Sequence, residues 1–280
     1  MLYALDDQEV AELKGLELVP RFHGARMLLV VFRTDADVVR TVLPRQLQPC
    51  EDPLGVAFVA DYASTNFGLS YREAGLSLRC RLGRESGLYH LCMPVDDDVA
   101  MVGGRESFGF PKKMAESISL HEGQGALRGT VVRRGVELMH IEAKTTGPAS
   151  DDDVRTVFDE HDGQPCSRSF LFKFFPAPGG KSLDYLPRIV RQQTAVAPLK
   201  VQQVDAELTL RSSPLDPWAD IPVRGVEAAI SGTFDLTLQH GKVVRRVWNV
   251  LRFLPHLFYK TDTLALLRAA KGSPGPARRR

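Results

Sequence analysis

Residues 126–145 read ALRGTVVRRGVELMHIEAKT. Two apolar runs flank the polar triplet at 133–135, and a glycine after two long polar residues is typical of a tight turn between strands. The stretch therefore predicts a β-hairpin that turns at residues 133–135. A hairpin needs further strands beside it to bury its apolar face, so the same pattern is expected elsewhere in the chain.

Short apolar runs of this kind recur along most of the chain, separated by turn residues, and such runs predict strands. The predicted strands cover residues 26–33, 55–63, 76–82, 87–93, 98–104, 115–122, 169–175, 199–211 and 226–238. Their regular spacing indicates a meandering antiparallel sheet that closes or curls to protect its edges. The predicted fold class is mainly β (α+β), a single domain with a few peripheral helices.

Two segments are predicted to be helical. Residues 35–43 begin with an aspartate cap and end before a proline. The longest helical candidate covers residues 241–270 and is interrupted by Pro255. The acidic runs at 96–98 and 151–153 lack the spaced oxygens and glycine of a calcium loop, so they are interpreted as solvated turns.

The composition excludes several classes of protein. Of the 280 residues 44% are hydrophobic and 25% are charged, and the net charge of +2 gives no general attraction to nucleic acid. No apolar run approaches the ~20 residues of a membrane-spanning helix, and the acidic start MLYALDDQEVAEL does not resemble a signal peptide. Four cysteines without a C-x-x-C pair indicate free thiols. We therefore expect a cytoplasmic protein.

No motif indicates a metal or a cofactor. The seven histidines never occur at the spacings of common zinc motifs. The stretch GQGALRG (123–129) lies between predicted strands, whereas a dinucleotide loop needs a helix after it. His90 and His140 each interrupt an apolar strand and are interpreted as hydrogen-bonded core histidines. We expect no metal and no cofactor.

The stretch VGGRESFGFPKKMA (102–115) places two adjacent lysines in an apolar part of the chain. Ionised lysines are almost never fully buried, so a solvated turn is the simple interpretation. The catalytic alternative is that Lys112 attacks a ketone in its uncharged form, which desolvation and a neighbouring cation both favour. Phe110 supplies the apolar surroundings, and Lys113 and Arg105 supply the cations. The product of such an attack is an iminium ion, which withdraws electrons and so allows an adjacent carboxylate to leave as carbon dioxide.

This stretch is similar to the lysine motif of the acetoacetate decarboxylase family, in which Gly-Arg-Glu is followed by an aromatic residue, Pro, Lys and Lys. Acetoacetate decarboxylase is itself a standard example of a lysine activated by a cationic neighbour. The resemblance implies that Lys112 forms a Schiff base with a small keto acid and that Lys113 favours the uncharged form of Lys112.

The resemblance extends over residues 20–240. It includes FHGARMLLVVFRTDADVVRTVLP (22–44), SYREAGL (70–76) and DIPVRGVEAAISGTFDL (220–236). It implies that the sheet forms the β-cone of that family and that the protein is a homo-oligomer. Residues 1–240 are then the β-cone domain, and residues 241–280 are a C-terminal helical extension with a basic tail.

Three more residues complete the predicted site. The resemblance implies that Glu73 moves protons during the reaction, whereas an ion pair to a neighbouring arginine is the structural alternative. Arg105 is expected to contact the substrate or to pair with Glu106 and brace the lysine loop. Phe110 is expected to line the pocket and to keep water away from the reacting amine.

The chain departs from the family at two positions. An arginine that is held to engage the substrate carboxylate corresponds to Ala25, and a second family acid corresponds to Phe58. Arg26 and Asp61 lie nearby, but both are expected on the opposite face of their strands because strand residues alternate. Loss of an arginine–carboxylate contact weakens the case for a β-keto acid, since that contact is strong and sets geometry.

The departures leave several functions open. Decarboxylation by a Schiff-base lysine is the leading hypothesis, and aldol condensation with dehydration of a pyruvate-type keto acid uses the same lysine. A non-catalytic protein that binds a small ligand in the same cone is a second class of function. The amphipathic segment 242–268 suggests either a packing helix or a membrane-surface helix.

Overall fold

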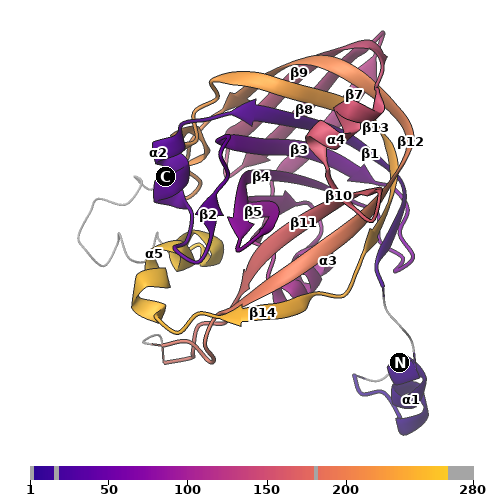
Figure 1. Cartoon of the computed structure of the whole chain (residues 1–280). Coiled ribbons are helices and arrows are strands. Elements are labelled where there is room, and N and C mark those ends of the chain that lie inside the picture. The colour runs from indigo at the N-terminus through magenta and orange to yellow at the C-terminus, as the bar shows by residue number, and fades with distance from the viewer. Residues whose placement is uncertain (1–2, 16–18, 180–181, 264–280) are drawn as a thin grey trace, which may run out of the picture.

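The computed structural model describes residues 3–15, 19–179 and 182–263, and strands dominate it (Figure 1). The strands are β1 (Arg21–Arg33), β2 (Gln48–Pro49), β3 (Leu54–Tyr62), β4 (Tyr71–Leu82), β5 (Glu85–Val95), β6 (Lys112–Met114), β7 (Ser117–Gly123), β8 (Ala126–Arg133), β9 (Val136–Pro148), β10 (Asp159–His161), β11 (Gln164–Lys173), β12 (Arg188–Leu210), β13 (Gly225–Leu238) and β14 (Lys242–Arg246). The helices are α1 (Asp7–Gly15), α2 (Ala36–Val42), α3 (Asp98–Val102), α4 (Asp151–Val157) and α5 (Val250–Thr261), with short helical turns η1 (Gly103–Phe108) and η2 (Trp218–Asp220).

Seven of the strands close into a barrel. Neighbours are hydrogen-bonded in the order β11-β5-β4-β3-β1-β13-β12, and β12 pairs in turn with β11, which completes the ring. The pairing of β5 with β11 is parallel, and the other pairs in the ring are antiparallel. Closure removes the unpaired strand edges that an open sheet exposes. The prediction of a mainly β fold with a closed, largely antiparallel sheet is confirmed.

One long strand joins the barrel to a second layer. β12 is 23 residues long; its first half pairs with β11 and β13, and its second half pairs with β9. From β9 the sheet continues through β8 to β7, and these strands lie against the outside of β3 and β4 (Figure 1). The second layer therefore covers part of the barrel wall.

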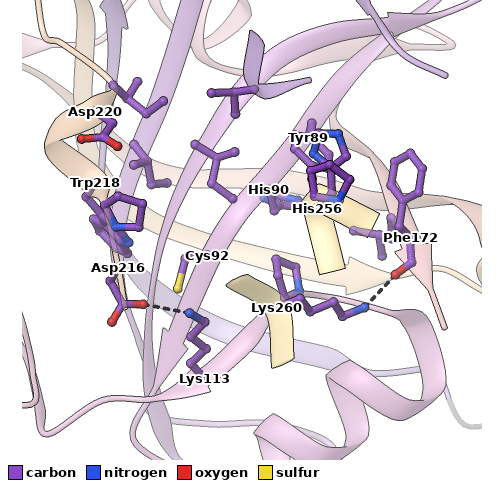
Figure 2. Close-up of a pocket in the computed structure, with 18 of the residues that line it drawn as sticks. Tyr89, His90, Cys92, Lys113, Phe172, Asp216, Trp218, Asp220, His256 and Lys260 are labelled. Carbon is purple, nitrogen blue, oxygen red and sulfur yellow. Dashed lines mark hydrogen bonds and ion pairs between the residues drawn. The ribbon is translucent and has the colours of Figure 1, made fainter. Parts of the chain in front are cut away.

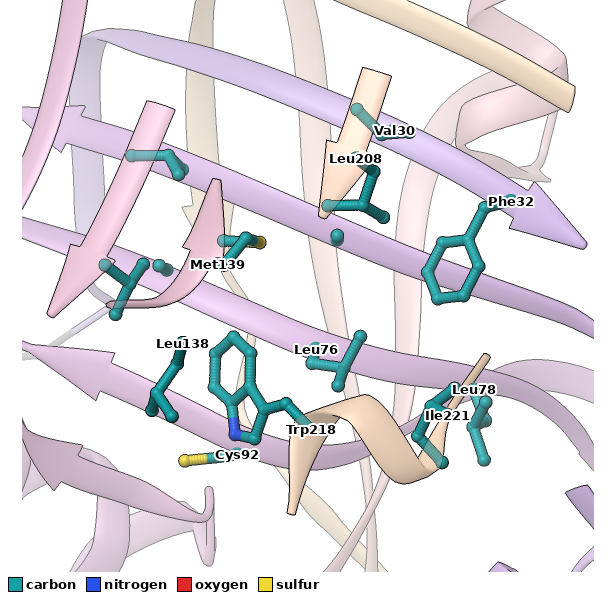
Figure 3. Packing of buried hydrophobic residues seen from close by; sticks show 14 of the residues in the cluster. Val30, Phe32, Leu76, Leu78, Cys92, Leu138, Met139, Leu208, Trp218 and Ile221 are labelled. Carbon is teal, nitrogen blue, oxygen red and sulfur yellow. The ribbon is translucent and has the colours of Figure 1, made fainter. Parts of the chain in front are cut away.

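Strand alternation divides the apolar residues into two clusters. Along β1, Met27 and Leu29 belong to a cluster inside the barrel, whereas Leu28, Val30 and Phe32 belong to a cluster between the barrel and the second layer. Figure 3 shows Val30 and Phe32 in this outer cluster. Because both faces of the strand are covered, its sequence is a continuous apolar run, and successive residues contribute to different cores.

The hairpin at residues 126–145 is confirmed. Arg133 and Val136 are the last paired residues of β8 and β9, so Arg134 and Gly135 form a two-residue turn. Both turn residues have positive φ, 53° and 74°. Two successive positive φ values define the hairpin turn whose twist matches that of the flanking strands, and glycine adopts such a value without strain.

The predicted strand at 98–104 is wrong, because these residues form α3 and the beginning of η1. The carboxylate of Asp97 accepts a hydrogen bond from the backbone N–H of Ala100 at 2.7 Å and so caps α3. A short apolar run does not distinguish a strand from a helix, and the acidic run before it, interpreted as a turn, is the helix start signal.

The acidic run at 151–153 also begins a helix and is not a turn. In α4 the Ser150 hydroxyl accepts a hydrogen bond from the backbone N–H of Asp153 at 3.2 Å. The Asp153 carboxylate accepts one from the backbone N–H of Ser150 at 2.8 Å. This reciprocal arrangement is a capping box, which satisfies two N–H groups at the helix start.

The two predicted helices have different outcomes. Residues 36–42 form α2, which confirms the first prediction, although the Asp35 carboxylate binds Arg224 and makes no cap hydrogen bond. The second prediction is wrong for residues 242–246, which form β14 and pair with β12. It is confirmed for α5, except that Pro255 lies inside this helix and does not interrupt it, and the last residues of the predicted segment lie outside the described part of the chain. No helix in that part is long and apolar enough to cross a membrane.

Candidate active site

The two adjacent lysines lie on β6, a three-residue strand that pairs in parallel with the end of β5. Successive strand residues point to opposite faces, so the two side chains enter different environments. Lys112 is only 6% exposed and Lys113 only 3%. The interpretation of these lysines as part of a solvated turn is therefore wrong, and each buried amine needs a partner.

Lys112 points into the barrel and pairs with Glu73 of β4. Its Nζ atom lies 3.0 Å from Oε2 of Glu73 and 5.3 Å from the centre of the Tyr71 ring. A methyl group on Gly104 would lie 2.7 Å from the Lys112 side chain, so the missing side chain at this position gives the lysine its path. The Phe110 ring is also close, with its centre 6.0 Å from Nζ.

Glu73 is 3% exposed and has one satisfied oxygen and one free oxygen. Oε2 binds Lys112 and accepts a hydrogen bond of 3.4 Å from the Tyr71 hydroxyl, whereas Oε1 has no hydrogen-bond partner among the described residues. Burial raises the pKa of Glu73 above its usual range, and the contacts with Lys112 and Tyr71 offset only part of that effect. A carboxyl group in this state both donates and accepts protons more readily near neutral pH than an exposed glutamate does.

The amine and the carboxylate open into a cavity of about 480 Å³ inside the barrel. Its walls are mainly aromatic and aliphatic side chains from the barrel strands and from α3 and η1. Phe58 is one of them, and its ring occupies the space where a side chain at Gly75 would otherwise lie. Among the described residues, Lys112 and Glu73 are the only charged side chains that line this cavity.

His90 lies between this cavity and a second one. Its Nδ1 is 2.6 Å from the Ser77 hydroxyl, and its Nε2 is 2.7 Å from the Ser169 hydroxyl. Burial, with Lys112 nearby, lowers the pKa of His90 to about 3, so the ring is neutral at physiological pH. The prediction of a hydrogen-bonded core histidine is confirmed for His90 and wrong for His140, which is partly exposed and bridges two glutamates.

Lys113 points to the opposite face and enters a cluster of charges, of which Figure 2 shows the contact with Asp216. Its Nζ lies 2.8 Å from Asp216 and 2.8 Å from Asp262, and both carboxylates also bind Arg133. Burial by itself lowers the pKa of a lysine, but Cys92 and the two carboxylates outweigh it and raise the pKa of Lys113. Two cations and two anions therefore balance each other on this face.

The second cavity, of about 300 Å³, lies beside this charge cluster and beneath α5. Figure 2 shows Lys113 directed at Asp216 on one side of it and Lys260 on the other. Lys260 donates hydrogen bonds to the backbone carbonyls of Gly109, at 2.6 Å, and Phe172, at 2.7 Å. Gly109 lies three residues before Lys112 and Phe172 lies on β11, so α5 contacts both the segment that leads into β6 and the barrel wall.

The other predicted site residues have different positions. Phe110 is 7% exposed and lines the cavity that contains Lys112. Arg105 is not among the residues that line that cavity, and within the described ranges no ion pair joins it to Glu106. Sequence reasoning missed Asp216 and Asp262 entirely, and no motif marks either residue.

The two departures at the start of the sheet have clear structural counterparts. β1 has an irregular register between Phe22 and Ala25, but Arg26 still points away from the cavity and pairs with Glu122 at 3.5 Å. Phe58 faces the cavity, whereas Asp61 lies 3.9 Å from Arg72. The expectation that neither Arg26 nor Asp61 replaces the missing side chains is confirmed.

In the described part of the chain, no group of three histidine, cysteine, aspartate or glutamate side chains is arranged to hold a metal ion. Each of the four cysteines is free.

Comparison with known proteins identifies relatives that match most of the chain. A family model for acetoacetate decarboxylase matches residues 10–248. Acetoacetate decarboxylase 1 of Mesorhizobium japonicum is 34% identical over 232 residues, covering 80% of this chain and 87% of the relative. Acetoacetate decarboxylase of Burkholderia cenocepacia is 32% identical over 225 residues, with the same coverage.

Solved structures show the same fold. A structure from studies of acetoacetate decarboxylase has a TM-score of 0.75 at 20% identity, covering 88% of this chain and all of that one. An acetoacetate decarboxylase-like enzyme from Sphingomonas wittichii has a TM-score of 0.71 at 18% identity, covering 83% of this chain and 95% of that one. The lysine motif, the barrel and the matched length agree, and the chain belongs to the acetoacetate decarboxylase family.

Proposed function

We propose that this protein is a Schiff-base lyase that decarboxylates a keto acid through Lys112. The single observation that carries the proposal is the buried pair of Lys112 and Glu73, 3.0 Å apart, at the wall of an otherwise uncharged cavity. A lysine placed only for stability would not need a cavity large enough for a ligand beside its amine.

The proposed reaction begins when the uncharged amine of Lys112 attacks the carbonyl carbon of the keto acid. The resulting carbinolamine loses water and becomes an iminium ion. The bond between the substrate's carboxylate and its neighbouring carbon then breaks, carbon dioxide leaves, and the bonding electrons neutralise the iminium as an enamine. Protonation of the enamine carbon and hydrolysis release a ketone and restore the amine.

Glu73 is suited to the proton transfers in this sequence. As a carboxylate it takes the proton that Lys112 must lose before attack, and as an acid it returns a proton to the carbinolamine or to the enamine carbon. Its free oxygen Oε1 and its raised pKa both support this role. Phe110 and Tyr71 flank the amine and limit the access of water.

We propose that Lys113 acts on the site without entering it. Its side chain lies on the other face of β6, and its charge is opposed by Asp216 and Asp262. The proposal keeps the expectation that the Lys113 cation favours the uncharged form of Lys112, and it adds a second role, the fixing of β6 in the barrel wall.

Aldol condensation with dehydration is the second candidate function. It uses the same iminium and enamine. No arginine is among the described residues that line the cavity, which favours this reaction, because a keto acid that keeps its carboxylate needs no arginine to hold that group in line with a breaking bond. A protein of similar fold, the enduracididine biosynthesis enzyme MppR, is known in complex with the condensation product of pyruvate and imidazole 4-carboxaldehyde; its TM-score is 0.64 at 18% identity, covering 81% of this chain and 90% of that one.

Trapping tests the proposal. The protein is incubated with acetoacetate or pyruvate, borohydride is added, and peptides are analysed by mass spectrometry. We expect a reduced adduct on Lys112 and none on the Lys112→Ala variant, and carbon dioxide release distinguishes decarboxylation from condensation. Binding of these acids without any adduct at Lys112 would instead indicate the non-catalytic alternative.

A further inference from the structure

The cavity beside Lys112 is much larger than a four-carbon keto acid. Its volume of about 480 Å³ falls within the range of about 300–1,000 Å³ that is typical of sites for drug-sized ligands. A small acid held by one covalent bond would leave most of this apolar surface in contact with water. The excess volume therefore points to a larger substrate.

The wall nearest to Glu73 is a continuous aromatic surface. The ring centres of Phe22 and Tyr62 are 4.6 Å apart, those of Tyr62 and Tyr71 are 5.1 Å apart, and Phe67 meets Phe22 edge to face at 5.6 Å. All four rings line the cavity. Such a surface binds flat or extended apolar groups through area and ring contacts, with little demand for hydrogen bonds.

The far wall is mainly apolar, with Thr194 as a polar residue of β12. Glu73 lies on β4, and β12 and β13 are each three strands away from β4 around the ring, on the opposite side of the barrel. Val196 of β12 and Leu236 of β13 line the cavity there. A substrate whose carbonyl carbon is at Lys112 therefore extends its remaining atoms across the barrel toward aliphatic side chains.

A remote charge on the substrate would have no partner. Among the described residues that line the cavity, no cation other than Lys112 is present. The nearby arginines are engaged elsewhere, Arg26 with Glu122 and Arg72 with Asp61 and Asp96. A carboxylate next to the reacting carbon is compensated by the iminium charge itself, but a more distant one would be buried without compensation, which is costly.

We propose that the substrate carries a bulky apolar group, an extended alkyl or aryl chain, on the carbonyl that Lys112 attacks, and that the cavity selects for this group. The inference rests on the proposed Schiff-base function of Lys112. It narrows the substrate from keto acids in general to those whose non-reacting part is apolar.

A series of methyl ketones tests the inference, because each forms the same iminium without a decarboxylation step. The probes are acetone, its homologues of increasing chain length, and benzylacetone, each trapped on Lys112 with borohydride. We expect the concentration for half-maximal trapping to fall by about fourfold for each added methylene until the cavity is full, which corresponds to the burial of one methylene. Levulinate, which carries a remote carboxylate, is expected to require a higher concentration than the ketone of equal chain length.

Two outcomes separate the inference from the function on which it rests. If acetone and levulinate are trapped as readily as the long ketones, the inference is wrong and the Schiff-base proposal stands. If no ketone of any size and no keto acid gives an adduct on Lys112, the Schiff-base proposal itself fails.

Val196→Phe provides a structural test of where the chain lies. With a larger side chain on the far wall, the concentration for half-maximal trapping is expected to stop falling at a shorter ketone than in the wild type. Trapping of acetone should stay unchanged. Val244→Phe on β14, where the side chain is 37% exposed and does not line the cavity, is the control. Leu236→Trp replaces Val196→Phe if the latter does not fold. If the far-wall variant changed the half-maximal concentrations of acetone and of long ketones by the same factor, the chain of the ketone would not extend to this wall, and the proposed placement would be wrong.

Discussion

Lys112 and Lys113 lie on opposite faces of β6 and have very different surroundings. On the barrel side, Lys112 borders a large apolar cavity and, within the described part of the chain, pairs with the single carboxylate of Glu73, whose Oε1 accepts no hydrogen bond there. On the other side, Lys113 is enclosed by two carboxylates that also bind Arg133. The difference shows how strand alternation makes one lysine available to a ligand and uses its neighbour to balance buried charge.

The face of β6 that carries Lys113, here called the enclosed face, depends on residues near the end of the described chain. Asp262 directly follows α5, and Lys260 lies within it, whereas the family model ends at residue 248. Both side chains contact β6 or the residues just before it. The C-terminal helix therefore contributes to the surroundings of the lysine pair, although it lies outside the matched region.

On the face of β6 that carries Lys112, here called the open face, the largest effect is expected from Glu73→Gln. The amide keeps the size of the side chain but neither accepts the amine proton nor returns one, so the rate of keto acid turnover should fall by about 10²–10⁴-fold. The assay is carbon dioxide release per folded molecule. Glu122→Gln, which alters an exposed ion pair outside the barrel, is the control. An unchanged rate for Glu73→Gln would remove Glu73 from the mechanism.

Substitutions on the enclosed face should mainly lower the stability of the protein. Lys113→Met leaves two carboxylates with one cation, and Asp216→Asn leaves two cations with one carboxylate, so each should lower the free energy of unfolding by about 3–5 kcal/mol. Urea denaturation measures this, with the exposed residue Asp220 changed to Asn as a control in the same segment.

The same two variants distinguish a purely structural role of Lys113 from an electrostatic effect of its charge on Lys112. If the charges on this face act on Lys112, Lys113→Met should raise the pH at which Lys112 is acylated, and Asp216→Asn should lower it. Opposite shifts in reactivity with equal losses of stability would confirm the tuning role of Lys113. Parallel shifts, or none, would leave only the role of fixing β6.

The sequence predicted the open face far better than the enclosed one. Lys112 and Glu73 lie in short motifs whose residue types and neighbours carry the resemblance, and most barrel strands show clear apolar runs. The partner of Lys113, in contrast, is 103 residues away in the chain, and an isolated aspartate has no pattern that marks it. Such ion pairs are set by the way β6, the segment around Asp216 and α5 meet in space, which single-sequence reasoning does not capture.

The strand wrongly predicted at 98–104 has a similar cause. This segment has too few apolar residues to show whether they repeat with the period of a helix or of a strand. The Asp97 cap stabilises the helix there. The error mattered for the site, because Ala100 of α3 and Gly104 and Phe108 of η1 line the cavity.

The smallest predicted effect concerns pH and Lys260. Burial, with Arg105 and Lys173 nearby, lowers the pKa of Lys260 to about 7, and the carbonyls of Gly109 and Phe172 accept both hydrogens of a neutral amine. The unfolded chain keeps a proton on this amine to a much higher pH than the folded chain does. The free energy of unfolding should therefore rise with pH above about 7, because the unfolded state binds more protons there.

Lys260→Met should remove this rise, which amounts to at most about 1.4 kcal/mol per pH unit. Urea denaturation near pH 7 and near pH 9 measures the slope, and the exposed Lys242→Met on β14 is the matched control. An identical slope in wild type and Lys260→Met would mean that Lys260 keeps its proton in the folded state. In that case α5 would place a third cation beside the lysine pair, and the enclosed face would no longer be balanced in charge.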